Sequence, residues 1–193
     1  MKILGDVTCQ AALFVYKDDG SENAAWNSVC GTYQQEGPVR GELHNKKPAF
    51  LDGLRTWNEG VKPTNSYLAI YAHMGKSGLG CVRNDPAREV TWQELANALP
   101  NGVAILWLIG CNSQECKTAW APLVGPVLGH LLVTTATKYW QPFLTCFNMA
   151  ISLDPIVLHA DIPSEVKRSS PKLGQNTEYY RVDAQKRGFT QVP

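Results

Sequence analysis

Short apolar runs separated by polar segments dominate the hydrophobic pattern of the chain. Residues 11–16 and 103–109 are almost wholly apolar and rich in β-forming side chains. Residues 66–72 and 131–135 have the same character. Strands in the middle of a parallel sheet are buried on both faces, and they therefore lack the polar alternation of half-exposed strands. The pattern predicts four buried strands.

Helical spacing lies between these strands. Residues 48–59 carry four apolar side chains three or four positions apart, which are Phe50, Leu51, Leu54 and Trp57. This spacing places them on one helical face. Residues 91–99 begin with Thr91 and have Glu94 three positions later, the spacing of a capping box. The other segments are predicted as helices at 116–124 and 141–153, strands at 156–159 and 177–182, a long irregular stretch at 20–48 and a flexible loop at 163–177.

Strands and helices alternate from residue 66 onward, and this order decides the fold class. Parallel neighbouring strands need a crossover, usually a helix, and such crossovers are right-handed. We therefore expect an α/β protein with a mostly parallel central sheet and helices on both faces. A length of 193 residues and a hydrophobic content of 44% fit a single domain, residues 1–193, with a sizeable core.

Charge and cysteine usage exclude several classes of protein. Lys and Arg number 18 against 17 Asp and Glu, a net charge of +1, which gives no field for steering the chain to nucleic acid or anionic lipid. No apolar run approaches the ~20 residues of a membrane span, and we expect no secretory signal at the N-terminus. Four cysteines without paired spacing are expected to be free thiols in the cytoplasm: Cys9, Cys30, Cys81 and Cys146.

The candidate chemistry lies at the carboxyl ends of two strands. Sites in open parallel sheets gather at that edge. The run at 66–72 is followed directly by His73, and the run at 103–109 by Gly110 and Cys111. One helical crossover joins the two strands, and such strands are usually neighbours. We therefore expect His73 and Cys111 to form a catalytic dyad.

A thiol beside an imidazole is suited to acyl transfer. A thiol with a pKa of ~8.5 is only partly ionised near neutral pH, and a nearby imidazole raises the thiolate fraction. The imidazole also protonates the leaving amine, while backbone N–H groups hold the oxyanion. The amides of Gly75 and Cys111 are the candidate donors. Because a single strand-end His or Cys is more often structural, the prediction depends on the pair.

Two other motifs point to different chemistry and are weaker. Cys111 and Cys116 are separated by four residues, which suggests a redox disulfide or half of a metal site. However, the spacing is not Cys-x-x-Cys, and no second ligand pair lies at a zinc-like distance. Gly75-Lys76-Ser77 is similar to the end of a phosphate loop, but the first Gly of that motif would fall at Ile70. We expect neither a metal nor an organic cofactor.

The segments around His73 and Cys111 resemble the caspase-like cysteine peptidases, including bacterial and CHAT-type members. Tyr-Leu-Ala-Ile-Tyr-Ala-His-Met-Gly at 67–75 resembles the family's hydrophobic strand that ends in the catalytic His. Val-Ala-Ile-Leu-Trp-Leu-Ile-Gly-Cys-Asn-Ser at 103–113 resembles the strand that ends in the catalytic Cys. Between them, Gly80-Cys81 and the segment 90–95 look like the family's short hairpin and helix start. The resemblance covers residues 66–153 and implies a three-layer caspase-like fold.

The resemblance also implies roles for further residues. The family's oxyanion donor is the amide of a Gly directly after the His, whereas Met74 stands there and Gly75 follows, so either amide is a candidate. The loop after the third core strand lines the family's substrate pocket, which assigns Lys138 and Trp140 to that pocket. Lys138 would attract an acidic side chain there, or it is simply solvated.

Together these features predict a cytoplasmic cysteine endopeptidase that cleaves a protein or peptide. With no sensor domain in 193 residues, control would come from a separate regulatory chain, and the resemblance implies a role in bacterial defence or cell death. The alternative is a catalytically inactive caspase-like module that holds a binding partner in the same cleft.

Overall fold

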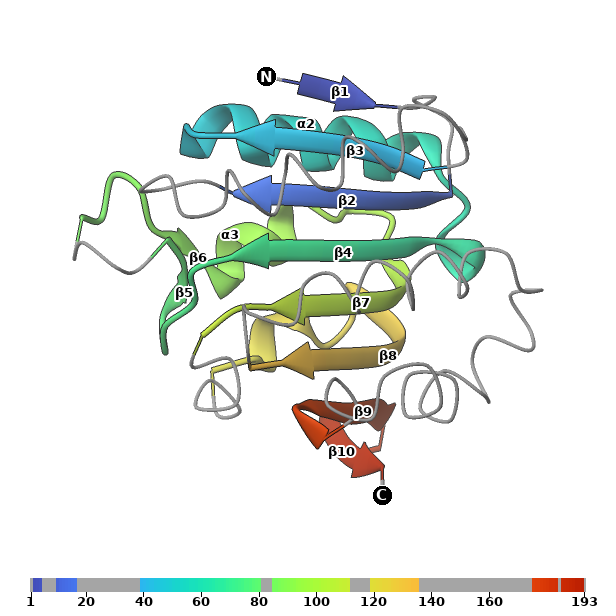
Figure 1. Ribbon diagram of the computed structural model, residues 1–193. Coiled ribbons are helices and arrows are strands. Elements are labelled where there is room, and N and C mark those ends of the chain that lie inside the picture. Colours follow the sequence, from blue (N-terminus) through green and yellow to red (C-terminus); the bar gives the residue numbers. More distant parts are fainter. Residues whose placement is uncertain are drawn as a thin grey trace.

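The protein is built on an eight-stranded sheet (Figure 1). The computed structural model describes residues 2–4, 10–16, 39–80, 85–111, 119–135, 175–183 and 185–192. The strands of this sheet are β1 (Lys2–Leu4), β2 (Ala11–Tyr16), β3 (Val39–His44), β4 (Tyr67–Ala72), β7 (Val103–Ile109), β8 (Val127–Thr134), β9 (Thr177–Asp183) and β10 (Gly188–Val192). Their order across the sheet is β1-β3-β2-β4-β7-β8-β9-β10.

The centre of the sheet is parallel and its edges are antiparallel. The neighbouring pairs β3–β2, β2–β4, β4–β7 and β7–β8 are parallel. The pairs β1–β3, β8–β9 and β9–β10 are antiparallel. The predicted α/β class with a mostly parallel central sheet is therefore confirmed, as are the predicted strands at 11–16, 66–72 and 103–109.

Helices α2 (Lys47–Gly60) and α3 (Trp92–Asn97) were both predicted, and both are confirmed. The capping box of α3 is present, because the Glu94 N–H donates to Thr91 Oγ1 and the Thr91 N–H donates to Glu94 Oε2 at 2.9 Å. Glu94 Oε1 also forms an ion pair with Lys47 Nζ at 2.6 Å. This carboxylate therefore links the starts of α2 and α3.

The irregular stretch predicted at 20–48 is wrong at its described end. Val39–His44 forms β3, and helix α2 follows it. The inward-facing side chains of β3 are Arg40, Glu42 and His44, which are 4%, 0% and 2% exposed. Because these residues are polar, the segment lacks the apolar pattern by which a buried strand is recognised.

Further boundaries differ from the prediction. Strand β8 begins at Val127 rather than at residue 131, and β9 confirms the strand predicted at 177–182. The α-helix predicted at 116–124 is not found in its described part, where residues 121–123 form a 3₁₀ helix containing Pro122. Proline has no N–H to continue a helical ladder. The segments predicted at 141–153 and 156–159 lie outside the described residues.

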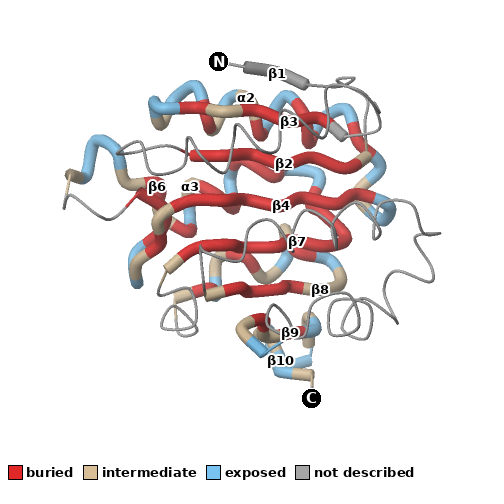
Figure 2. The backbone as a smooth tube through the Cα atoms, viewed as in Figure 1, coloured by how far each residue is buried: buried red, intermediate tan, exposed pale blue. Residues whose placement is uncertain are grey.

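Helices α2 and α3 pack on one face of the sheet, which we call the helix face (Figure 1). Its strand side chains include Phe14, Ile70, Ala72 and Leu108, and they pack against Phe50, Leu54, Trp57 and Leu95 of the helices. Since successive side chains of a strand point to opposite faces, the residues between them form the opposite face. These are also buried, among them Leu13, Val15, Ala69, Tyr71, Trp107 and Ile109. Figure 2 shows the central strands buried along almost their whole length.

A polar chain crosses the opposite face and links three strands. Trp107 Nε1 donates to Thr134 Oγ1 at 2.9 Å, and Thr134 Oγ1 lies 2.8 Å from Thr177 Oγ1. Buried polar groups of this kind are favourable only when they are hydrogen-bonded. These hydrogen bonds therefore fix β7, β8 and β9 relative to one another. Within the described ranges, no helix is long and apolar enough to span a membrane.

Candidate functional site

His73 and Cys111 follow two neighbouring parallel strands at the same edge of the sheet. Strand β4 pairs with β7 in a register that places Tyr71 beside Ile109. His73 and Cys111 each lie two residues beyond this pair, at equal steps along the two strands. Neighbouring strands are about 4.8 Å apart. The predicted neighbourhood of the two strands is confirmed, and both residues are half-buried.

Side-chain alternation indicates that His73 and Cys111 share one face of the sheet. Ala72 and Met74 both belong to the core of the helix face, so His73 between them points to the opposite face. A Cβ on Gly110 would lie 2.8 Å from Met74 Cγ, which places that position on the helix face as well. Cys111, the next residue, then falls on the opposite face with His73.

Gly110 is required by the close approach of the two strand ends. Its N–H donates to the Thr134 carbonyl oxygen at 3.0 Å. A Cβ at this position would lie only 2.1 Å from the Ala72 carbonyl oxygen, far inside van der Waals contact. The residue before the candidate nucleophile is therefore held between β4 and β8 in a space that fits only glycine.

The backbone at Gly75 does not supply a free oxyanion donor, which corrects the prediction for that residue. The Gly75 N–H donates to the Gly78 carbonyl oxygen at 3.0 Å, and the Gly80 N–H donates to the His73 carbonyl oxygen at 2.8 Å. These bonds flank an antiparallel bridge between Met74 and Leu79. In such a bridge the Met74 N–H points away from Leu79, and no contact among the described residues engages it. Met74, one of the two amides considered, is thus the better candidate donor.

A short arm follows His73 and is anchored to the sheet. Strands β5 (Gly78–Leu79) and β6 (Val90–Thr91) form an antiparallel pair, whereas Cys81 of the predicted hairpin lies outside the described residues. Tyr16, at the carboxyl end of β2, donates its hydroxyl to the Arg88 carbonyl oxygen at 2.5 Å. A Cβ on Gly80, which has a φ of 76°, would lie 2.8 Å from the Tyr16 ring. The arm therefore packs closely against β2.

Sequence reasoning missed a buried charged cluster on β3. Arg40 Nε donates to Glu42 Oε1 at 2.5 Å, the Arg40 Nη2 also contacts that oxygen, and His44 Nε2 lies 2.5 Å from Glu42 Oε2. The His44 ring stacks on Phe14. A Cβ on Gly53 of α2 would lie 2.6 Å from Glu42 Oε2, so a glycine makes room for the cluster. It sits two strands away from β4 and has no contact with His73 in the described residues.

Three residues named from the sequence cannot be placed at this edge or away from it. Lys138, Trp140 and Cys116 lie outside the described residues. A cavity of about 670 Å³ is lined by the end of α3, by residues that precede β7, among them Asn101, and by Leu128 near the start of β8, so it lies at the amino edge of these strands, opposite the dyad. Within the part of the chain that the structure describes, no group of three or more His, Cys, Asp or Glu is placed to hold a metal ion.

Comparisons with known proteins give no family for the chain. No protein-family model matches the sequence, and a search of curated proteins finds no significant match. The functional interpretation therefore rests on the geometry of the sheet edge and on the motifs around His73 and Cys111.

Proposed function

We propose that the protein is a cysteine endopeptidase of the caspase-like type, with Cys111 as nucleophile and His73 as general acid and base. The observation that carries the proposal is the shared register of the two residues, each two positions beyond the Tyr71–Ile109 pair on neighbouring parallel strands. Alternation places both side chains on one face. A dyad needs this kind of adjacency before any question of pKa arises.

The proposed reaction proceeds through a thioester. The Cys111 thiolate attacks the scissile carbonyl carbon, and the amides of Met74 and Cys111 hold the oxyanion that forms. As the C–N bond breaks, His73 transfers a proton to the leaving amine. A water molecule then attacks the thioester and gives its proton to His73, which releases the carboxylic acid product and regenerates the thiol.

The strand order supports the finer fold assignment. Strands β3-β2-β4-β7-β8 follow the order 2-1-3-4-5 of a doubly wound sheet, in which the order reverses between β2 and β4. Ligands of such sheets bind outside the carboxyl ends at this reversal, and His73 follows β4. The proposal includes a three-layer caspase-like arrangement with helices on both faces, for which the burial of the opposite face is the support.

Substrate, control and location extend the proposal through the resemblance alone. They comprise a protein or peptide substrate, a pocket that includes Lys138 and Trp140, a separate regulatory chain, and a cytoplasmic role in bacterial defence or cell death. None of these requires a metal or an organic cofactor for the dyad chemistry.

Cys111→Ala is the decisive variant. The wild-type protein and the variant are incubated with a positional-scanning peptide library, and cleavage is followed by mass spectrometry. We expect cleavage by the wild type and none by the variant. Cys146→Ala is the matched control, since that residue is predicted to be a non-catalytic thiol, and it should cleave like the wild type. Cleavage that survives Cys111→Ala would refute the proposal.

A second candidate function is a catalytically inactive module that binds a partner at the same edge. One observation favours it: Met74 replaces the glycine that the family has after the His. In that case the wild type cleaves no peptide, yet it retains peptides that Cys111→Ala retains equally well.

A further inference from the structure

Thr134 holds the residue that precedes the candidate nucleophile. It is the last residue of β8, and the β7–β8 register pairs it with Ile109. The Gly110 N–H donates to the Thr134 carbonyl oxygen at 3.0 Å. Because Gly110 is bound in this way on its β8 side and closely approaches β4 on its other side, the position of Thr134 helps to set the position of Cys111.

The side chain of Thr134 is buried on the same face of the sheet as the dyad. Leu131 and Val133 belong to the core of the helix face, so Thr134 points to the opposite face. Its hydroxyl is bound from two sides, since Trp107 Nε1 lies 2.9 Å away and Thr177 Oγ1 lies 2.8 Å away. An indole N–H can only donate, so Thr134 Oγ1 accepts from Trp107 and uses its own proton or its second lone pair toward Thr177. Two hydrogen bonds in different directions therefore fix the rotamer of Thr134.

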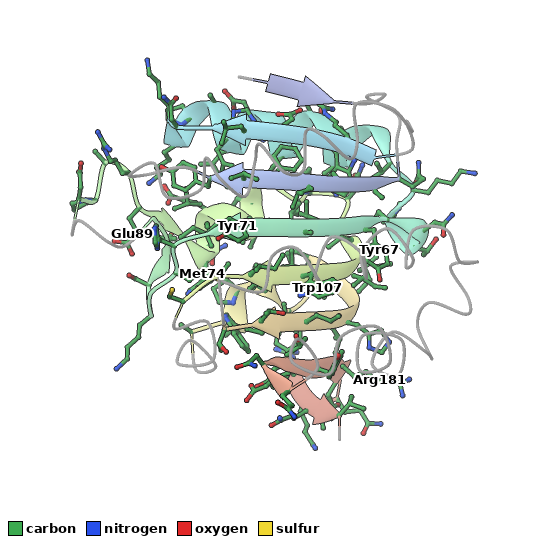
Figure 3. All side chains as sticks on the ribbon, in the orientation of Figure 1. Tyr67, Tyr71, Met74, Glu89, Trp107 and Arg181 are labelled. Carbon is green, nitrogen blue, oxygen red and sulfur yellow. The ribbon has the colours of Figure 1, made fainter. Side chains whose placement is uncertain are left out.

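Thr177 is the first residue of β9, and it brings the C-terminal hairpin of β9 and β10 into this network. The antiparallel register of β8 and β9 places Thr177 directly opposite Thr134, and both side chains are buried. Figure 3 shows the strands in this order, with Trp107 on β7 and Arg181 on β9. A continuous path of hydrogen bonds therefore runs from the hairpin through Thr134 to Gly110.

Hydroxyl groups are not needed to fill the space at this pair. On the same face, the next pair of the β8–β9 register toward the middle of the strands is Leu132 and Tyr179, and both are buried. Two valines have the shape of two threonines, and replacing both partners of a buried hydrogen bond by apolar groups is nearly neutral for stability. What the hydroxyls of Thr134 and Thr177 add is direction, since a hydrogen bond weakens steeply when its atoms leave alignment. The threonine pair is therefore suited to holding a backbone position accurately.

We propose that Thr177 is a positioning residue for the Cys111 thiol and that it acts through Thr134. This inference rests on the proposed function of the His73–Cys111 edge and deepens it: the reactivity of the nucleophile depends on how the β9–β10 hairpin is seated. Thr177 is two strand spacings from Gly110, or about 10 Å between Cα atoms, so its effect on the thiol is transmitted by Thr134. A displacement of about 1 Å at a reacting group lowers the rate by about 100-fold, and a smaller displacement is still measurable.

Thr177→Val and Thr177→Ser test the inference as a pair. Valine removes the hydroxyl and keeps the shape, whereas serine keeps the hydroxyl. The backbone pairing of β8 with β9 remains in both, because the Thr135 N–H donates to the Asn176 carbonyl oxygen at 3.1 Å. We expect Thr177→Val to lower kcat for peptide cleavage about tenfold with KM nearly unchanged, and Thr177→Ser to cleave like the wild type. Thr190→Val is the matched control, since the Thr190 hydroxyl lies on the same hairpin and bonds Asp183 Oδ2 at 3.3 Å, and it should leave kcat unaltered.

A double variant tests the path through Thr134. Thr134→Val removes the middle hydroxyl and should lower kcat by a similar factor. If Thr177 acts through that hydroxyl, Thr134→Val/Thr177→Val should cleave no more slowly than the slower of the two single variants. Losses that multiply overturn the inference, and so does a kcat that Thr134→Val leaves unchanged. The second of these criteria decides the matter even if Thr177→Val does not fold.

The reactivity of the Cys111 thiol separates this inference from the peptidase proposal. Alkylation by iodoacetamide near pH 7 is followed by mass spectrometry of the peptide that contains Cys111. A thiol displaced from the imidazole of His73 has a smaller thiolate fraction, so Thr177→Val should be alkylated about threefold or more slowly, and Thr177→Ser at the wild-type rate. This pattern supports the positioning role even if the wild type cleaves no peptide. Equal alkylation rates in all the variants, together with normal cleavage by the wild type, refute the positioning role and leave the peptidase proposal standing.

Discussion

Gly110→Ala is expected to displace the candidate nucleophile and to destabilise the protein. The added Cβ would lie 2.1 Å from the Ala72 carbonyl oxygen and 2.8 Å from Met74 Cγ. Met74 is able to rotate, but the Ala72 oxygen belongs to the backbone of β4. Relieving this contact to an ordinary distance requires a shift of about 1 Å between the ends of β4 and β7, and Cys111 moves with Gly110.

The loss of stability and the loss of activity are both large enough to measure. Overpacking of a tight site costs about 1–3 kcal/mol, which lowers the melting temperature of a domain of this size by about 2–12 °C. A displacement of about 1 Å at a reacting group lowers kcat/KM by about 100-fold. Met74→Ala in the same chain should recover little, because it removes the side-chain contact and leaves the Ala72 oxygen in place.

The assays are thermal unfolding by circular dichroism and peptide cleavage measured well below the melting temperature. The alkylation rate of Cys111 by iodoacetamide reports the position of the thiol independently of cleavage. Gly188→Ala in β10 is the matched control, since the nearest atom to its added Cβ is 3.8 Å away, and it should behave like the wild type. A Gly110→Ala variant with unchanged stability and unchanged Cys111 reactivity would contradict the packing derived for the two strand ends.

Three further predictions concern the surroundings of the site. Glu42→Gln removes the countercharge of the buried Arg40, so we expect a loss of about 3–5 kcal/mol in the free energy of unfolding by urea; a loss below 1 kcal/mol would mean that the pair contributes little. Burial raises the pKa of Glu94, but hydrogen bonds from Lys47 and Thr91 outweigh it and lower the pKa below its ordinary value of 4.5. The stability that Glu94 contributes is therefore present above pH 4.5 and lost as the pH falls, so unfolding curves of Glu94→Gln and the wild type should differ at pH 7 and converge in acid. Tyr16→Phe removes the hydroxyl that holds the arm at Arg88, and we expect faster amide hydrogen exchange at Gly80, with about 1 kcal/mol of lost stability; unchanged exchange would show that ring packing alone anchors the arm.

Local sequence determined the centre of the fold. The runs that form β2, β4 and β7 are apolar throughout because both faces of these strands are buried. The apolar character of each residue can be seen in the sequence directly. The capping box at Thr91 was equally readable, since it depends on side chains three positions apart. The sequence order of strand and helix was enough to predict that β4 and β7 are neighbours, and with them His73 and Cys111.

Only the tertiary structure decided which polar groups are paired and which are left open. Strand β3 was missed because its inward-facing side chains are polar. Arg40, Glu42 and His44 are buried because they pair with one another and because Gly53 leaves space for them on α2. Gly75 was a candidate donor until its N–H was found bonded to Gly78, which directs attention to Met74. Apolar burial is a property of each side chain, whereas a hydrogen bond or ion pair needs a partner whose position depends on the complete fold. For that reason the sequence was enough to predict where the candidate site lies, and the structure was needed to tell which of its backbone N–H groups are already bonded.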